Sequence, residues 1–240
     1  MLPLLTVVIP VLCDADAAAA LLPQIPATAD VEIVVVDGGD DPGLEPVVGA
    51  HARARLRRTT AGRAHQMNVG AAGAAGEWLL FLHADSALPR TWLPAIAELG
   101  GDVVGGWFRF ALDDAAWQAR VIERLVAWRV RHLRLPYGDQ GLFVRRRVFE
   151  RLGGFRELAL LEDVEFVRRL VRAGRVVELP LVLRTSSRRW RRDGWFRRSA
   201  KNLAIVGLYL AGVPPARLAR RYHHPTAHGA AGTPDRGAPR

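Results

Sequence analysis

Three aspartates each follow an apolar run, at the position where a buried strand would end. Asp14 closes VVIPVLCD, Asp37 closes VEIVVVD and Asp85 closes WLLFLHAD. In an open α/β sheet the ligand crevice lies outside the carboxyl ends of the strands. A single aspartate in such a place is usually a turn former or a helix cap. Three of them at one edge favour a site that binds a cation or a polar ligand.

Other residues have types suited to binding phosphate or moving protons. Arg63 stands in a glycine-rich stretch that opens a helix, and Glu162 and Asp163 begin a later helix. A helix N-terminus with an arginine favours anions, although an ordinary start of an alanine-rich packing helix explains the pattern equally well. The acidic pair could provide a general base or only complement the helix dipole. Asp139, in PYGDQG, is compatible with a site residue or with a turn before Gly141.

The scaffold for these residues follows from the hydrophobic pattern. Continuous β-branched runs alternate with Ala- and Leu-rich stretches, which is typical of strands joined by helical crossovers. We therefore expect an α/β fold with a mostly parallel open sheet flanked by helices. The expected strands are 4–12, 31–36, 53–59, 78–82, 105–112 and 141–146, and the expected helices are 15–22, 44–51, 64–76, 91–99, 115–131 and 161–173.

Composition and charge suggest how the chain is divided. Half of the 240 residues are hydrophobic, enough for one sizeable core. The formal net charge of +10 is concentrated between Arg184 and Arg221, where ten arginines and Lys201 stand against Asp193 alone. We expect a domain over 1–190, a basic helical C-terminal extension over 191–222 and a disordered, Pro- and Gly-rich tail over 223–240.

The expected location is cytoplasmic. The apolar N-terminus lacks a preceding basic residue and a cleavage site, so we expect a strand there and not a signal peptide. Cys13 is the only cysteine, which excludes an intrachain disulfide and favours a reduced setting. The stretch 203–213 is too short to span a membrane. The basic extension either lies on an anionic membrane surface at the inner face or packs on the domain, and without a reader motif it predicts no nucleic-acid partner.

Taken in order, the motifs resemble those of family 2 glycosyltransferases with the GT-A fold. The His-Ala-Asp and Gly-Asp-Gln variants are similar to those of a subgroup associated with arsenosugar biosynthesis. The resemblance implies inverting, metal-dependent transfer of a sugar from a UDP- or GDP-sugar to a hydroxyl acceptor that the sequence does not identify. It also implies a donor half over about 1–100 and an acceptor half over about 101–190. The motifs are VVIPVLCD, VEIVVVDGG, GRAHQMNVGAAGAAGEWLLFLHAD, GDQGLFVRRRVFERLGGF, LLEDVEFVRRLVRAG and SSRRW.

The resemblance assigns the donor-binding residues. It implies that Asp37 accepts hydrogen bonds from the nucleotide base and that Asp14 lies near the ribose or base. Arg63 and Asn68 would lie near the base and the diphosphate.

A divalent cation, Mg²⁺ or Mn²⁺, is implied at Asp85. Such an ion is held by one or two carboxylates together with phosphate oxygens, and it neutralises the departing diphosphate. His83 stands where relatives commonly carry the first acid of Asp-x-Asp, so it either touches the metal or packs as an ordinary buried side chain.

On the acceptor side, the resemblance makes Asp163 the base that takes the acceptor's proton, with Glu162 orienting it or binding the acceptor or sugar. Arg189 would pair with the leaving diphosphate, and Trp190 would stack under a sugar or cover the donor. If the basic extension lies on a membrane, it would bring the site to a lipid-linked acceptor.

Two departures from the family pattern leave other functions open. Cys13-Asp14 replaces the usual Asn-Glu, and Pro42 replaces the second acid of the motif that follows Asp37. A degenerate donor-binding or scaffold protein is one alternative. A sugar-phosphate nucleotidyltransferase is another, but it needs a glycine-rich loop where this chain has CDADAAAA.

Overall fold

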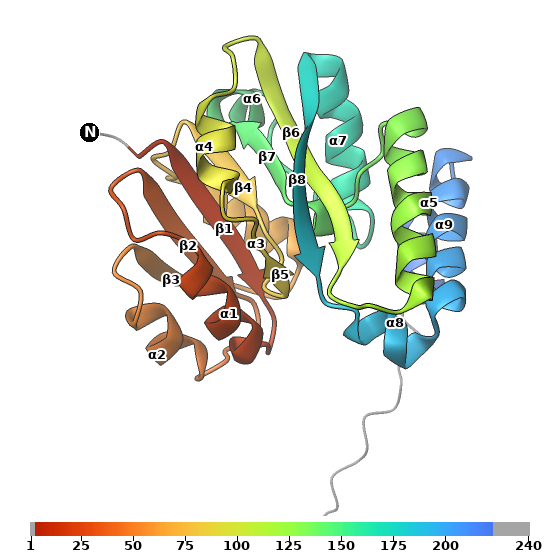
Figure 1. The fold of residues 1–240 in the computed structure, drawn as a ribbon, viewed down its shortest axis with the longest axis horizontal. Helices are drawn as coiled ribbons and strands as arrows, with labels where there is room; N and C mark the ends of the chain where they lie inside the picture. The colour runs from red at the N-terminus through yellow and green to blue at the C-terminus, as the bar shows by residue number, and fades with distance from the viewer. Residues whose placement is uncertain (1–2, 223–240) are drawn as a thin grey trace, which may run out of the picture.

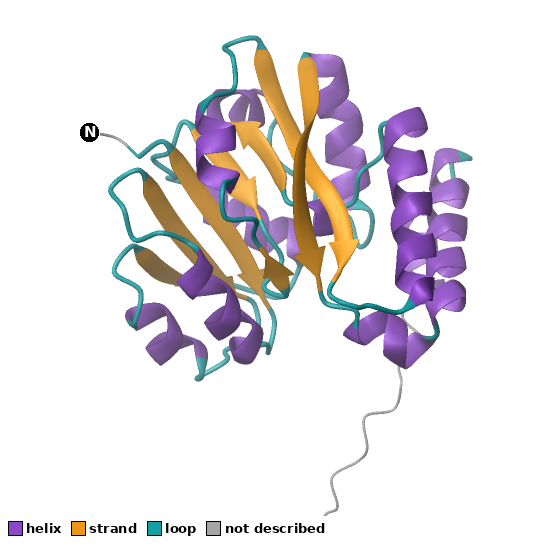
Figure 2. Cartoon of the chain, in the orientation of Figure 1, coloured by secondary structure: helices purple, strands orange, loops and turns teal. Residues whose placement is uncertain are grey.

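An eight-stranded sheet forms the centre of the molecule. The computed structural model describes residues 3–222, and the strand order is β3-β2-β1-β4-β7-β6-β8-β5. Helices cover both faces of the sheet, and α5 and α9 stand together beyond β6 and β8 (Figures 1 and 2). The strands are β1 (Leu5–Val11), β2 (Val31–Asp37), β3 (Ala54–Arg58), β4 (Trp78–Phe81), β5 (Ser86–Ala87), β6 (Val103–Leu112), β7 (Leu142–Arg145) and β8 (Arg175–Thr185).

The first half of the sheet is parallel, as predicted. Strand β1 pairs in parallel with β2 and β4, and β2 pairs in parallel with β3. Both β1 and β2 are buried on two faces, because their β-branched side chains pack alternately into the two helical layers. One layer contains α1 (Ala15–Leu21), α2 (Leu44–Gly49) and α4 (Trp92–Ala97), and the other contains α3 (Arg63–Ala71), α6 (Arg146–Arg151) and α7 (Glu162–Ala173).

The second half of the sheet is mixed, so the prediction of a mostly parallel sheet is wrong there. Strand β7 runs antiparallel to both β4 and β6, and β5 runs antiparallel to β8. Only β6 and β8 form a parallel pair in this half. A strand buried on both faces has the same continuous apolar sequence in either direction, so GLFVRR gives no sign of its orientation.

Strand β8 is not predicted by the sequence pattern. Pro180 stands in its middle, and most of its side chains are partly or fully exposed. Proline cannot donate to a strand ladder and is found at edges and bulges. The pairing register with β6 shifts between Phe108 and Arg109, and Pro180 falls in that irregularity. The strand therefore continues past the proline and ends at Thr185, beside the site described below.

Close packing at Gly70 brings α3 to the carboxyl ends of the strands. A β-carbon there would lie 2.3 Å from Val8 Cγ1 and 2.9 Å from Val36 Cγ2, so no larger residue fits without a shift. One turn earlier, Gln66 Nε2 donates to backbone carbonyls at the ends of β1 and β2, at 2.7 and 2.9 Å. These contacts fix the start of α3, where Arg63 lies.

The C-terminal segment is helical. It contains α8 (Arg188–Asp193), α9 (Trp195–Leu210) and α10 (Pro215–Tyr222), and α9 packs against α5 (Trp117–Leu133) (Figure 1). The predicted boundary between residues 190 and 191 therefore falls inside α8. Among residues 3–222, no helix is long and apolar enough to cross a membrane. The tail predicted to be disordered, 223–240, lies outside the described residues.

Candidate active site

A cavity of about 810 Å³ opens beside the carboxyl ends of β1 and β4. Segments far apart in the sequence meet there, because the crossovers between the parallel strands of the first half return their carboxyl ends to this edge. They include the start of α3, the short 3₁₀ helix η2 (Gly138–Gln140), the start of α7 and the loop that joins β8 to α8. The predicted site residues that line the cavity are Asp14, Arg63, His83, Asp85, Glu162, Asp163, Arg189 and Trp190, together with Asp139.

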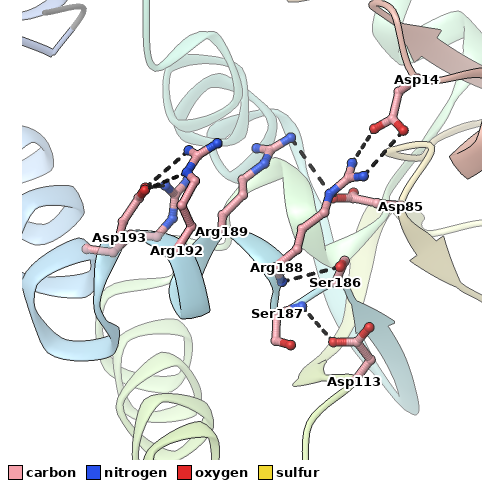
Figure 3. Close-up of polar contacts among 10 residues, drawn as sticks. Asp14, Asp85, Asp113, Ser186, Ser187, Arg188, Arg189, Arg192 and Asp193 are labelled. Carbon is pink, nitrogen blue, oxygen red and sulfur yellow. Dashed lines mark hydrogen bonds and ion pairs between the residues drawn. The ribbon is translucent and has the colours of Figure 1, made fainter. Parts of the chain in front are cut away.

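Two of the strand-end carboxylates share one guanidinium (Figure 3). Arg188 donates to both carboxylate oxygens of Asp14, and its Nη2 lies 3.4 Å from Asp85 Oδ2. These contacts raise the pKa of Arg188, chiefly through the hydrogen bond to Asp14. Arg189 Nη2 lies 4.0 Å from the same Asp85 oxygen. Sequence reasoning assigned the diphosphate role to Arg189 and gave none to Arg188, since adjacent arginines do not reveal which one turns toward the strand ends.

The loop that leads into α8, whose first residues are these arginines, is tied to the segment after β6. Ser187 donates its backbone N–H to Asp113 Oδ1 at 2.6 Å and its hydroxyl to Asp114 Oδ2 at 2.9 Å (Figure 3 shows the first contact). Arg191 Nε donates to Asp114 Oδ2 at 2.5 Å. That contact, followed by the backbone N–H of Ala116, lowers the pKa of Asp114 to about 2. The anchored loop holds Arg188 at the mouth of the cavity.

Among the described residues, the cavity offers two carboxylates, and no third protein ligand, to a divalent cation. In the described part of the chain no group of three or more His, Cys, Asp or Glu side chains is arranged to hold a metal. Asp14 and Asp85 nevertheless flank one position, which the positive charge of Arg188 now fills. Two carboxylates around a cation, completed by phosphate oxygens, are the ligand set that Mg²⁺ and Mn²⁺ accept. The donor chemistry therefore suits a metal that arrives with a diphosphate.

The acidic pair at the start of α7 also lines the cavity. Leu161 adopts the left-handed conformation just before the helix, with φ 67°, a strained geometry of the kind found at functional sites. Asp163 Oδ2 accepts the backbone N–H of Gly138 at 2.6 Å. Arg63 Nη1 lies 3.6 Å from Glu162 Oε1. Burial, and then repulsion from Asp163, raise the pKa of Glu162 to about 7, against the opposing charge of Arg63.

Three buried polar atoms near this pair have no hydrogen-bond partner among the described residues: His83 Nε2, Tyr137 Oη and Asp139 Oδ1. A buried polar atom left unpaired costs about 1–3 kcal/mol, so such a group is normally satisfied by water or a ligand. A β-carbon at Gly138 would lie 3.1 Å from His83 Nε2 and 3.3 Å from Asp163 Oδ2. The absence of a side chain at Gly138 therefore keeps space open beside the unpaired His83 Nε2 and the Asp163 carboxylate.

The charge states of these groups follow from their surroundings. Burial, helped by Arg63 and Arg189, holds the pKa of His83 well below its usual value, so the imidazole is neutral at pH 7. Burial also raises the pKa of Asp139 to about 6; Arg129 opposes this shift, and Asp163 and Asp85 add to it. The negative charges of Asp163 and Asp85 thus both act on Asp139. Sequence reasoning left its role open and missed Tyr137.

Two predicted donor residues are not among those that line the cavity. Asp37 is buried, and its carboxylate accepts the backbone N–H groups of Gly39 and Asp41, both at 2.9 Å. The amide of Asn68 forms two hydrogen bonds with the backbone of Phe155: Nδ2 donates to the carbonyl at 2.8 Å, and Oδ1 accepts from the N–H at 2.9 Å. In this structure both side chains brace loops around the site.

Trp190 lies at the cavity but is largely committed to packing. It is buried in a cluster with Phe110 and Ile122, and its Nε1 donates to Ser199 Oγ at 3.1 Å. The guanidinium of Arg198 lies 5.3 Å from the ring centroid. The indole therefore supports the wall formed by α8 and α9, and a stacking role toward a sugar stays a prediction.

Known proteins share the architecture of this chain. No curated protein matches it. Among solved structures, the mannosyltransferase PcManGT from Pyrobaculum calidifontis, in complex with GDP-Man and Mn²⁺, is similar with a TM-score of 0.63 and 20% identity over 93% of this chain and 69% of that one. TarS 1-349 of S. aureus, in complex with UDP-GlcNAc, is similar with a TM-score of 0.55 and 18% identity over 76% of this chain and 58% of that one. The chain thus spans little more than half of TarS 1-349, and at these identities the likeness establishes a GT-A-like α/β fold.

The sequence itself identifies the family. Residues 6–153, more than half of the chain, match the profile of the family described as Glycosyl transferase family 2. That stretch includes Asp14 after β1, Asp85 after β4 and Asp139 in η2, all of which line the cavity. The chain belongs to glycosyl transferase family 2.

Proposed function

We propose that this glycosyltransferase moves a sugar from a nucleoside diphosphate to a hydroxyl acceptor, with inversion at the transferred carbon. The observation that carries the proposal is the grouping of two kinds of side chain in one cavity. Asp14 and Asp85 flank a cation position, and Glu162 and Asp163 line the same cavity. The solved relatives contain GDP-Man and UDP-GlcNAc, which supports GDP- and UDP-sugars as the donors to test first.

At the donor end, the chain stabilises charge on the leaving diphosphate. Arg63, Arg188 and Arg189 supply cations that line the cavity, and guanidinium groups bind phosphate through paired hydrogen bonds. Mg²⁺ or Mn²⁺ would be held by Asp85, with Asp14 as a second carboxylate, and when bound supplies Lewis-acid neutralisation of that charge. The Mn²⁺ in the PcManGT complex supports this assignment.

At the acceptor end, Asp163 is the proposed base. Inverting transfer needs a carboxylate on the face of the sugar opposite the leaving group, to take the acceptor's proton. The N–H of Gly138 fixes one oxygen of Asp163, and Glu162 stands beside it as the orienting residue. A positioned base of this kind contributes about 10²–10⁴ in rate.

The transferred sugar lies, in this proposal, against His83, Tyr137 and Asp139. Its anomeric carbon must sit between the diphosphate near Asp85 and the base Asp163. Asp139 is the carboxylate whose pKa is raised by both of those acids, after burial. Sugar hydroxyls, which donate and accept hydrogen bonds, are suited to the three unpaired atoms.

The acceptor and the location are finer parts of the proposal. The arginines of the C-terminal helices and the exposed apolar side chains of α9, such as Phe196 and Leu203, favour a lipid-linked acceptor and peripheral contact with the cytoplasmic face of a membrane. The resemblance to arsenosugar-type enzymes adds their acceptors to a screen.

Slow donor hydrolysis tests the proposal without knowledge of the acceptor. The protein is incubated with UDP-, GDP- and dTDP-sugars, with and without Mn²⁺, and release of the nucleoside diphosphate is measured. We expect metal-dependent turnover that falls by about 10²–10³ in Asp85→Asn, as for loss of one charge-stabilising group. The matched control is Asp16→Asn, an exposed aspartate of α1.

A second variant separates chemistry from binding. Asp163→Asn should retain nucleotide affinity in calorimetry while losing acceptor-dependent transfer. A fully active Asp163→Asn enzyme would remove the proposed base. Nucleotide binding with no turnover of any donor would favour the degenerate donor-binding alternative instead.

A further inference from the structure

A second cavity, of about 820 Å³, lies between α5 and the exposed face of β6 and β8. We refer to it as the α5 groove. Its floor is apolar, with Trp107, Phe110 and Val130 buried at the base and Val176 beside them. It is distinct from the active-site cavity and contains none of the proposed donor or acceptor residues.

The rim of the α5 groove is strongly basic. Six arginines and two glutamates line it. Arg109 pairs with Glu178 at 3.4 Å and Arg120 with Glu123 at 2.7 Å, which uses both acids. The remaining arginines, Arg124, Arg131, Arg134 and Arg184, are exposed, and their side chains form no hydrogen bond or ion pair within residues 3–222. Four uncompensated cations above an apolar floor match a ligand that is anionic at one end and apolar at the other.

The outer side of α5 exposes large apolar side chains. Trp117 is 64% exposed, Trp128 57% and Leu125 57%. The Trp117 ring contacts that of Phe196 on α9, with centroids 5.8 Å apart, so the apolar surface continues onto the neighbouring helix. Tryptophan is enriched at the interface between membrane and water, and arginine beside it pairs with lipid phosphates.

Helix periodicity places the arginines between the two features. At 3.6 residues per turn, Arg124 and Arg131 fall on the strip of α5 that separates the groove-lining Val130 from the exposed Trp117 and Trp128. The same strip therefore faces the groove on one side and the aromatic surface on the other. A basic strip between an apolar stripe and a groove is the arrangement of a helix that lies in a membrane interface.

We propose that the α5 groove and the aromatic side of α5 form a docking surface for an anionic phospholipid membrane. The lipid phosphate binds Arg124, Arg131 and Arg134, the apolar floor takes the adjoining part of the same lipid, and Trp117 and Trp128 enter the interfacial layer. This inference does not depend on the transfer reaction. It names the lipid-facing surface as α5, which the sequence did not suggest, in addition to α9.

Flotation with vesicles tests the surface. The full chain is mixed with vesicles of phosphatidylcholine alone or with about 30% phosphatidylglycerol, at low and high salt. We expect retention only on the anionic vesicles and loss of retention at high salt. The triple variant Arg124→Gln/Arg131→Gln/Arg134→Gln should weaken binding on the order of 10²-fold, since each basic residue at such a surface contributes about fivefold.

The control removes the same charge elsewhere. Arg147→Gln/Arg151→Gln/Arg172→Gln neutralises three exposed arginines of α6 and α7 that have no partner among the described side chains and should bind vesicles within about twofold of the parent. Trp117→Ala/Trp128→Ala should weaken binding while keeping its salt dependence. Donor hydrolysis is measured on the parent and on every variant. Loss of hydrolysis in a variant alone would indicate misfolding, whereas no hydrolysis by the parent would contradict the proposed transferase function and leave the vesicle result unaffected.

Three results would overturn the docking surface. One is equal retention of the α5 triple variant and its control. Another is equal retention on neutral and anionic vesicles. The third is binding of tripolyphosphate that requires Arg124, Arg131 and Arg134 in a chain that no vesicle retains, because the groove would then be a site for a soluble phosphate.

Discussion

Arg188 and Asp85 form an ion pair across the mouth of the active-site cavity, with Nη2 and Oδ2 3.4 Å apart, and the same guanidinium also binds Asp14 (Figure 3). A positive charge thus already occupies the position between the two carboxylates. The divalent cation proposed for this position would compete with Arg188. When the diphosphate arrives, its oxygens give the displaced guanidinium a new partner, so nucleotide and metal binding should reinforce each other.

Arg188→Gln tests this competition. Without this guanidinium, Asp14 loses its ion pair and Asp85 keeps only the 4.0 Å contact with Arg189. Affinity for Mn²⁺ in the absence of nucleotide should therefore rise by up to about fivefold, the worth of an exposed ion pair. Nucleotide affinity in the presence of Mn²⁺ should fall, because a phosphate-binding cation is lost. Calorimetry gives both constants. Arg192→Gln, which breaks only a pair with Asp193, is the control, and equal Mn²⁺ affinity in the two variants would contradict the competition.

Glu162→Gln should change how stability depends on pH. Burial first, then Asp163, raise the pKa of Glu162 from 4.5 to about 7. The folded state therefore favours the neutral acid, and this contribution to stability is complete below about pH 4.5 and is lost as the pH rises through about 7. The melting temperature of Glu162→Gln relative to the parent should accordingly be higher at pH 8 than at pH 5.

Glu98→Gln, at an exposed glutamate, should show no such trend in melting temperature. A Glu162→Gln difference that stays flat from pH 5 to pH 8 would mean that the carboxyl titrates as it does in the unfolded chain.

Asp139→Asn should affect the sugar and spare the nucleotide. If its carboxylate binds sugar hydroxyls, KM for the nucleotide sugar should rise by about tenfold or more, the usual effect of losing a hydrogen bond to a charged group. The dissociation constant of the nucleoside diphosphate alone should stay within about twofold, because in the proposed arrangement the diphosphate does not contact Asp139. Tyr137→Phe should act in the same direction more weakly. Equal losses for nucleotide and nucleotide sugar would move Asp139 out of the sugar site.

Asn68→Ala separates a loop-bracing residue from a donor ligand. Removal of the amide leaves the Phe155 N–H and carbonyl without their partner, which should cost about 1–3 kcal/mol in the free energy of unfolding measured in urea. Nucleotide affinity at low temperature should be close to that of the parent. A tenfold weaker nucleotide complex with unchanged stability would instead restore the donor role that the family resemblance implies.

Much of the donor half could be predicted from sequence. The alternation of β-branched runs with helical stretches fixes β1, β2 and β4, and a parallel sheet brings Asp14 and Asp85 to one edge. Strand direction beyond β4 could not be predicted, because burial on both faces removes the alternation that marks a half-exposed strand. Strand β8 was not predicted for a different reason. Proline normally argues against a strand, and the bulge that accommodates Pro180 leaves no pattern in the sequence.

The fine structure of the site depends on contacts between distant residues. Arg188 reaches Asp14 across 174 positions of sequence, and Gly138 meets Asp163 only because η2 and α7 converge. The hydrogen-bond partners of a side chain are equally hard to predict: nothing in the sequence around Asn68 indicates that its amide both donates to and accepts from the backbone of Phe155.

Gln140 belongs to the boundary between the two cavities. Its side chain borders the α5 groove, while its Oε1 accepts the N–H of Tyr137, which lines the active site, and its Nε2 binds the carbonyl of Phe108 in β6. A substitution of Gln140 would therefore change the α5 groove and the active-site cavity together. Selection for a different acceptor and selection for a different lipid would therefore converge on the same glutamine.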